Sequence, residues 1–147
     1  MSIWNQSLSR IQFAAGSSTS RGDGDSINQV FFDSTIYGDA FDRDTLAITT
    51  EWTLRRTQRV EADIIFNSAY RWDSYRGNVR SGNVWDIRRV ALHELGHALG
   101  LDHPDENGQS VSAQMNSILG NLDSLTADDI AGAQSLYGSG VTSNITF

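Results

Sequence analysis

Apolar residues recur with two different periods along this chain, and the change of period divides it into two halves. In the first half, short alternating or continuously apolar runs predict four β-strands, at residues 10–13, 29–32, 45–52 and 60–66. The last two runs are joined by a short polar connection, which predicts a hairpin. Residues 16–26 form a polar loop rich in Gly and Ser, and residues 67–84 are predicted as loop with one short strand at most.

Helical spacing is confined to the second half of the chain. Apolar residues at i, i+3 and i+4 predict a helix over residues 86–99, and Gly100 is a suitable stop because glycine adopts the left-handed conformation without strain. A second helix is predicted over residues 127–137, with Thr126 as its N-cap and Gly138 as its end. Strands that precede helices along the chain indicate an α+β fold.

Length and composition are those of one globular domain with a substantial core. The chain has 147 residues, of which 39% are hydrophobic and 20% are charged. Its net charge of −7 argues against nucleic acid and anionic membrane surfaces as partners, since both need a basic face. No apolar run is long enough to span a membrane. The absence of cysteine excludes a disulfide framework, a thiolate metal site and a cysteine nucleophile.

The candidate chemistry is concentrated in the segment HELGHALGLDH, which contains all three histidines of the chain. His93 and His97 are four residues apart on the predicted helix, so their side chains project from one face. Glu94 is adjacent to the first ligand and can reach a metal-bound water without ligating the metal. The glycine after the helix permits a turn that can bring back His103 as a third ligand. Three protein nitrogens leave one position open, which is typical of a catalytic zinc site.

The competing structural interpretation is that the three histidines are surface residues on a helix and its cap. The extended pattern specifies five positions, three of them by an uncommon residue type. A chance match in a chain of this length is on the order of one in 10⁵. We therefore predict one catalytic Zn²⁺ ion held by His93, His97 and His103, with Glu94 as the general base.

HELGHALGLDH resembles the zinc signature of the metzincin metalloproteases, and most closely that of the matrixins, the family of the matrix metalloproteinases. Residues 62–66 are similar to the matrixin strand before the active-site helix, and residues 125–138 are similar to the C-terminal helix. Met115 lies where the family's Met-turn belongs. The resemblance implies a zincin-like α+β catalytic domain with a twisted, mainly parallel sheet, an edge strand, an active-site helix and a C-terminal helix.

The same resemblance implies a secreted, extracellular endopeptidase that hydrolyses proteins or peptides, and we expect it to be a monomer. The substrate backbone would pair with a sheet edge. The main side-chain pocket would lie behind the zinc, with residues 116–122 as a wall, and would take an apolar residue. Two alternatives stay open. One is an inactive zinc-binding domain that recognises peptides, against which the retained Glu94 speaks. The other is a zinc hydrolase of a non-peptidase class.

Some positions depart from the family pattern. Pro104 follows the third histidine, where matrixins usually carry a small hydroxyl residue. Ser117 stands where the related serralysins place a tyrosine ligand. No further histidine is available for the second, structural zinc of animal matrixins. Structural Ca²⁺ could be held by acidic loops such as the one that contains Asp23 and Asp25.

We expect residues 1–138 to form the catalytic domain and residues 139–147 to form a short polar tail. In matrixins a first strand and a long first helix precede a tryptophan like Trp4, so the resemblance implies that the first strand and most of that helix are missing here. Apolar strand residues would then face water and the chain would be marginally stable. The residues concerned are Phe13, Phe31, Ile48 and Ile65.

Other motifs have simpler structural explanations. Residues 21–23 form an integrin-type Arg-Gly-Asp tripeptide, but in a Gly/Ser loop a plain turn is the simpler interpretation. Glycosylation patterns begin at Asn5 and Asn144, and such patterns are common by chance. Asp128 and Asp129 could be catalytic carboxylates, but their position at a helix start favours capping. In the family, this acidic pair helps to anchor the Met-turn.

Overall fold

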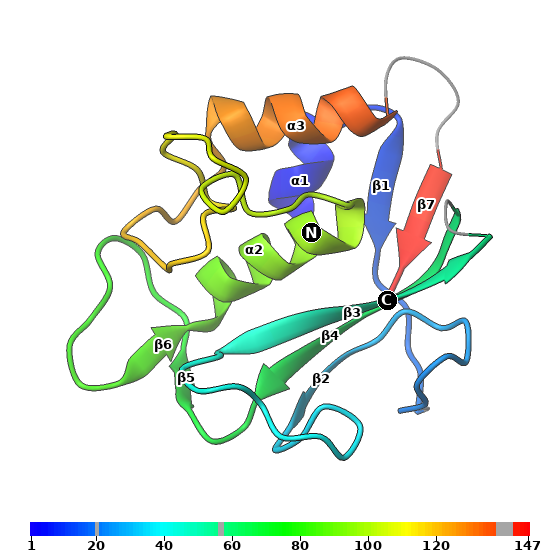
Figure 1. Ribbon diagram of the computed structural model, residues 1–147, viewed down its shortest axis with the longest axis horizontal. Helices are drawn as coiled ribbons and strands as arrows, with labels where there is room; N and C mark the ends of the chain where they lie inside the picture. Colours follow the sequence, from blue (N-terminus) through cyan, green and yellow to red (C-terminus); the bar gives the residue numbers. More distant parts are fainter. Residues whose placement is uncertain (20, 56–57, 138–142) are drawn as a thin grey trace.

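The computed structural model describes residues 1–19, 21–55, 58–137 and 143–147 (Figure 1). Strands predominate in the first half of the chain, and the two longer helices lie in the second. The elements are α1 (Ser2–Ser7), β1 (Ile11–Ala14), β2 (Val30–Asp33), β3 (Ala47–Leu54), β4 (Gln58–Asn67), β5 (Arg71–Asp73), β6 (Val84–Asp86), α2 (Ile87–Leu99), α3 (Ala127–Tyr137) and β7 (Ser143–Thr146). The arrangement is α+β, as predicted. Gly138 and residues 139–142 of the expected tail lie outside the described residues.

The central sheet has three strands in the order β2-β4-β3. β2 and β4 are parallel, and β3 and β4 form the predicted antiparallel hairpin, with Ala47 opposite Phe66. The pairs β1-β7 and β5-β6 are also parallel. Among the described strands, three of the four pairings are therefore parallel, and the antiparallel β3 lies at an edge of the central sheet, which is compatible with the resemblance. The described strands, however, form three sheets rather than one.

The main core lies between the central sheet and α2, which crosses it (Figure 1). β4 contributes Ala62, Ile64 and Phe66, which alternate along the strand and share the face toward α2. Trp4 of α1 is fully buried, and its indole Nε1 donates a hydrogen bond to the carbonyl of Leu92 at 2.9 Å. The N-terminal segment is thereby packed directly against the helix that carries the candidate site.

The apolar strand residues that were expected to face water are covered. Two are buried, Phe13 and Ile65, and two are half-buried, Phe31 and Ile48. The Phe13 ring packs on Phe147 with centroids 5.8 Å apart, and the Phe31 ring packs on Tyr37 at 6.0 Å. Tyr37 and Phe147 thus cover two of the four residues, and the expectation of exposure is wrong for these positions. It holds for other apolar residues of β2 and β3, since Val30, Phe32, Trp52 and Leu54 are exposed.

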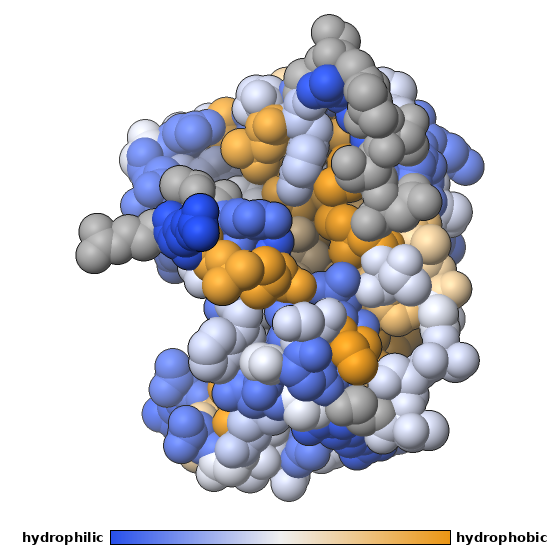
Figure 2. Space-filling model, turned by 90° about the vertical axis from the view of Figure 1, so that its right-hand side faces the viewer, coloured by the Kyte–Doolittle hydropathy of each residue, from blue (hydrophilic) through white to orange (hydrophobic). Residues whose placement is uncertain are grey.

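The end of the chain forms a strand that the sequence does not predict. β7 pairs in parallel with β1, with Ser143 opposite Ile11. Asn28 links this pair to the central sheet, since its side chain donates to the carbonyl of Thr146 at 2.9 Å and accepts from the N–H of Ala62 at 2.8 Å. A groove of about 710 Å³ separates the pair from β4, and Figure 2 shows apolar side chains gathered on this face.

Two further elements differ from the expectation. The segment 67–84 contains one short strand, β5, as the sequence allowed, but a further strand, β6, begins at its last residue. The six-residue helix α1 was not predicted, because six residues are too few for a periodic pattern. None of the helices in the described part of the chain is long and apolar enough to cross a membrane.

Candidate metal centre

α2 carries two of the three histidines, and local sequence explains where it begins and ends. Asp86 is the N-cap, and its side chain accepts a hydrogen bond from the N–H of Arg88 at 3.2 Å. Gly100 ends the helix in the left-handed conformation, with φ of 102°. The turn at this glycine reverses the chain and returns His103 toward the helix, as the spacing predicted.

The Nε2 atoms of the three histidines converge on one point. The Nε2–Nε2 distances are 2.9 Å for His93 and His97, 3.1 Å for His97 and His103, and 3.2 Å for His93 and His103. Nitrogen ligands of a tetrahedral zinc ion lie about 3.3 Å apart, given Zn–N distances of about 2.0–2.1 Å. Within the described residues, these three are the only group of His, Asp and Glu side chains that could hold a metal ion.

The other ring nitrogen of each histidine faces a hydrogen-bond acceptor. The contacts are His93 Nδ1 to the Gln114 carbonyl at 2.9 Å, His97 Nδ1 to the Leu101 carbonyl at 2.7 Å, and His103 Nδ1 to the Glu106 carboxylate at 2.8 Å. An acceptor at Nδ1 requires the hydrogen there, so the neutral ring presents a lone pair at Nε2. Three lone pairs directed at one another repel unless a cation lies between them. The donor set therefore fits a metal ion.

Burial keeps the imidazoles on α2 neutral. Desolvation lowers the pKa of His93 to about 4, and the neighbouring His97 acts in the same direction. Desolvation also lowers the pKa of His97 below its ordinary value. Both rings are therefore in the form that binds a metal ion over a wider pH range than an exposed histidine.

Glu94 lies in the same cleft but outside the group of nitrogen ligands. Its carboxylate accepts a hydrogen bond from the hydroxyl of Thr49 on β3 at 2.7 Å. Desolvation raises the pKa of Glu94 to about 7, and the bond from Thr49 opposes that rise. A buried carboxyl group that titrates near neutrality is suited to accepting and returning a proton.

Met115 forms a close-packed floor beneath α2. A Cβ placed on Gly96 would lie 2.2 Å from Met115 Sδ and 3.2 Å from the Trp4 ring, so the helix approaches closely only because glycine stands there. Asp129 of α3 holds this floor, since its carboxylate accepts from the backbone N–H groups of Gln114 and Met115, each at 3.0 Å. Because its carboxylate bonds to backbone N–H groups, Asp129 has a structural role here, as its position at a helix start favoured.

A cleft of about 990 Å³ is lined by β3 and by the segment after Met115, and the three histidines are part of its lining. Of residues 116–122, which were predicted to form a wall of the side-chain pocket, residues 116–119 line this cleft. Its lining also includes two aromatic side chains, Tyr70 and Trp85, and two acidic ones, Glu51 and Asp102. A length of edge strand open to this cleft can accept an extended peptide.

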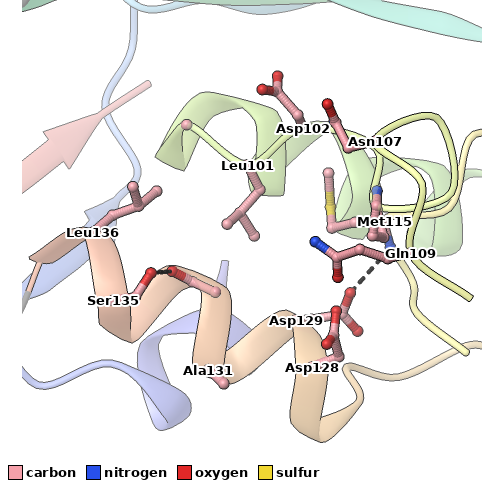
Figure 3. Close-up of a pocket in the computed structure, with 13 residues that line it drawn as sticks. Leu101, Asp102, Asn107, Gln109, Met115, Asp128, Asp129, Ala131, Ser135 and Leu136 are labelled. Atoms are coloured by element: carbon pink, nitrogen blue, oxygen red, sulfur yellow. Dashed lines mark hydrogen bonds between the residues drawn. The ribbon is translucent and has the colours of Figure 1, made fainter. Parts of the chain in front are cut away.

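A smaller pocket of about 280 Å³ lies on the other side of Met115, between α3 and the turn after α2 (Figure 3). Figure 3 shows Leu101 and Leu136 on one side of it and Asp128 and Asp129 on the other. None of the three histidines lines this pocket. It adjoins the cleft that contains the candidate metal ligands, since Gly100, Leu101 and Asp102 line both.

The Arg-Gly-Asp tripeptide is engaged with the rest of the molecule. The Arg21 guanidinium lies 5.5 Å from the centroid of the Phe31 ring, and the Asp23 carboxylate accepts from the indole N–H of Trp52 at 2.7 Å. These contacts support the turn interpretation. Calcium on Asp23 and Asp25 stays a prediction, since neither belongs to the group of described side chains that could hold a metal ion.

Four parts of the site were not identified from the sequence. They are the hydroxyl of Thr49, the backbone carbonyls of Leu101 and Gln114, and the carboxylate of Glu106. Thr49 and Gln114 lie far from their partners along the chain, so no local pattern could have found them. Glu106 follows His103 by three residues, and that spacing was an available signal.

Comparisons with known proteins match the chain to one family. Residues 1–138 match the family model described as Matrixin. The chain is 40% identical over 80 residues to macrophage metalloelastase of Oryctolagus cuniculus, covering 54% of this chain and 16% of that protein. It is 32% identical over 106 residues to macrophage metalloelastase of Rattus norvegicus, covering 71% and 21%. It is 38% identical over 79 residues to interstitial collagenase of Sus scrofa, covering 54% and 15%. The matched part is thus no more than 21% of the length of these relatives.

Proposed function

This chain belongs to the matrixin family, and from that premise we propose that it is a zinc-dependent endopeptidase that hydrolyses peptide bonds in proteins. The observation that carries the proposal is the convergence of three histidine Nε2 atoms within 3.2 Å of one another, in an open cleft beside a buried glutamate. The nitrogen atoms suit a zinc ion, and the glutamate suits proton transfer.

In this proposal His93, His97 and His103 hold one Zn²⁺ ion. When bound, zinc lowers the pKa of a water molecule and polarises the scissile carbonyl group. Glu94 takes a proton from the water that attacks the peptide carbonyl and later delivers it to the nitrogen of the departing amine. Its pKa of about 7 allows both transfers near neutral pH. The hydroxyl of Thr49 orients the carboxylate that carries the proton.

We propose that the substrate binds as an extended strand. β3 is an edge strand of the central sheet and lines the cleft, so its free backbone groups can pair with a peptide. The side chain on the leaving side of the scissile bond would enter the part of the cleft lined by Tyr70, Trp85 and residues 116–119. These residues favour an apolar side chain.

The wider setting is proposed from family membership. It comprises secretion, an extracellular location, action on matrix or other proteins, and a monomeric state. Residues 1–138, the span of the family match, are proposed as the catalytic domain. β7, from the segment after it, packs on that domain through β1.

The test is zinc content by mass analysis, combined with cleavage of an unstructured protein such as casein. We expect one zinc per chain and cleavage that a chelator abolishes. The His97→Ala variant should lose both metal and activity. A chain that binds one zinc and binds peptides but cleaves none would instead be the peptide-recognising zinc domain. A chain that holds no zinc would overturn both functions.

A further inference from the structure

One of the three histidines differs from the other two in how its ring is held. His93 and His97 stand on α2, and backbone carbonyls accept from their Nδ1 atoms. His103 stands on the turn after α2, its side chain is 26% exposed, and its Nδ1 contacts the Glu106 carboxylate at 2.8 Å. It is therefore the only one of the three whose ring orientation depends on another side chain.

Side-chain hydrogen bonds on either side of Glu106 hold the turn that carries it. The Asn107 side chain donates to the carbonyl of His103 at 2.9 Å. The Asp105 carboxylate accepts from the backbone N–H of Ser117 at 2.9 Å and from its hydroxyl at 2.7 Å. The Asn107 bond closes the turn on itself and the two Asp105 bonds tie it to Ser117, so the Glu106 carboxylate is presented to the imidazole by a defined backbone.

We propose that Glu106 is a positioning residue of the metal centre. Its carboxylate accepts the Nδ1 hydrogen of His103, which directs the Nε2 lone pair of that ring toward the ion and makes the ring a stronger donor. Carboxylate partners of this kind contribute about 10- to 100-fold to metal affinity. The inference deepens the proposed function, because it rests on the same three histidines as metal ligands.

Because Glu106 is exposed, its effect on metal binding can be distinguished from an effect on folding stability. Its side chain is 64% exposed, and an exposed ion pair adds little to folding stability. Removing it should therefore weaken metal binding without changing the unfolding of the metal-free chain.

Asp102 provides a matched control. It is exposed, adjacent to His103 in sequence and part of the lining of the same cleft. The Asp102→Asn variant removes one negative charge from the lining of the cleft and leaves the bond between Glu106 and Nδ1 in place. It thus measures the effect of charge alone.

The experiment measures the zinc dissociation constant of the full chain by competition with a chromophoric chelator, together with urea unfolding of the metal-free protein. We expect Glu106→Ala to raise the constant by about 10- to 100-fold. Glu106→Gln, which keeps an acceptor oxygen, should recover part of this loss. Asp102→Asn should change the constant by less than about threefold, and all metal-free unfolding curves should coincide.

Three results would overturn the inference. They are an unchanged constant in Glu106→Ala, an equal weakening in Asp102→Asn, and a matching loss of stability in the metal-free Glu106→Ala chain. Each leaves the parent chain able to bind zinc and so leaves the proposed function standing. A parent chain that binds no zinc would instead be a failure of the proposed function itself.

Discussion

Two buried carboxyl groups lie on opposite sides of the central sheet, and their electrostatics are alike. Glu94 reaches the sheet from α2 through Thr49. Thr49 is opposite Ile64 in the hairpin, so Asp63, the preceding residue of β4, points to the other face. Desolvation raises the pKa of Glu94 to about 7 and the pKa of Asp63 to about 6. A raised pKa alone therefore does not identify the catalytic candidate.

The partners of the two carboxylates make the distinction. Asp63 accepts from the backbone N–H of Gln29 at 2.8 Å and from the hydroxyl of Tyr37, and these donors flank β2 on either side. Asp63 thus holds connecting segments onto the sheet. Glu94 accepts one side-chain hydrogen bond, from Thr49, and lines an open cleft beside the histidines. The comparison teaches that bonding and access, rather than titration, separate an anchor from a proton carrier.

The largest expected effect comes from replacing each carboxylate in turn. Glu94→Ala should lower kcat by about 10²- to 10⁴-fold while zinc content and fold are kept, because the group handles a proton rather than the ion. Asp63→Ala should leave the kcat of the folded protein near that of the parent. The measurements are peptide cleavage and zinc content. A Glu94→Ala variant that cleaves at the parental rate would contradict the mechanism.

The second-largest expected effect is a loss of stability of the metal-free chain at acid pH, caused by protonation of His93. His93 has a pKa of about 4 in the fold, against about 6.5 when unfolded, so the unfolded chain binds more protons between these values. The free energy of unfolding should therefore fall as the pH drops from about 6.5 to about 4, by roughly 3 kcal/mol from this group. Urea unfolding at a series of pH values measures it, and His93→Gln should flatten the curve.

Asp63 should act with the opposite sign in the same measurement. Its pKa of about 6 in the fold lies above the unfolded value of about 4, so the folded chain binds more protons in that range. Its contribution to stability is therefore fully present below about pH 4 and is lost as the pH rises through about 6. In the Asp63→Asn variant, the free energy of unfolding should therefore fall more steeply than in the parent as the pH drops from about 6 to about 4. In His93→Gln it should fall less steeply. Superimposable curves for the parent and both variants would contradict this assignment.

A smaller effect is expected on the free energy of unfolding when the hydrogen bonds of Asp63 are removed. Asp63→Ala leaves the N–H of Gln29 and the hydroxyl of Tyr37 without their acceptor, which should cost about 2 kcal/mol. Tyr37→Phe removes one of the two bonds and should cost about 1 kcal/mol. Urea unfolding at neutral pH gives both values. Equal destabilisation by Glu94→Ala would remove the distinction between the two carboxylates.

The smallest effect concerns the hydroxyl that orients Glu94. Thr49→Val keeps the side-chain shape but loses the bond to the carboxylate, so kcat should fall about fivefold with little change in KM. Because this bond lowers the pKa of Glu94, its loss should also move the acid limb of the kcat profile to higher pH. Thr50→Val, on the opposite face of β3, is the matched control. An equal effect of the two variants would place the cause in the strand rather than in the hydrogen bond.

The sequence by itself determined the elements and side chains whose geometry is local. α2 and α3 coincide with their predicted ranges to within one residue, because their periodicity and caps lie within single segments. The hairpin β3-β4 follows for the same reason. His93, His97 and His103 converge as predicted, since one helical turn and one left-handed glycine are enough to bring them together.

Only the tertiary structure decided the contacts between distant segments. The bond from Thr49 to Glu94 joins residues 45 positions apart, and the pairing of β7 with β1 joins the two ends of the chain. The expected exposure of Phe13 failed because Phe147 covers it. Such contacts form only when many segments bury their surfaces together and so offset the entropy of closing long loops. No window of sequence contains that collective balance, so the three candidate metal ligands could be predicted from their spacing, whereas the groups that orient and cover them could not.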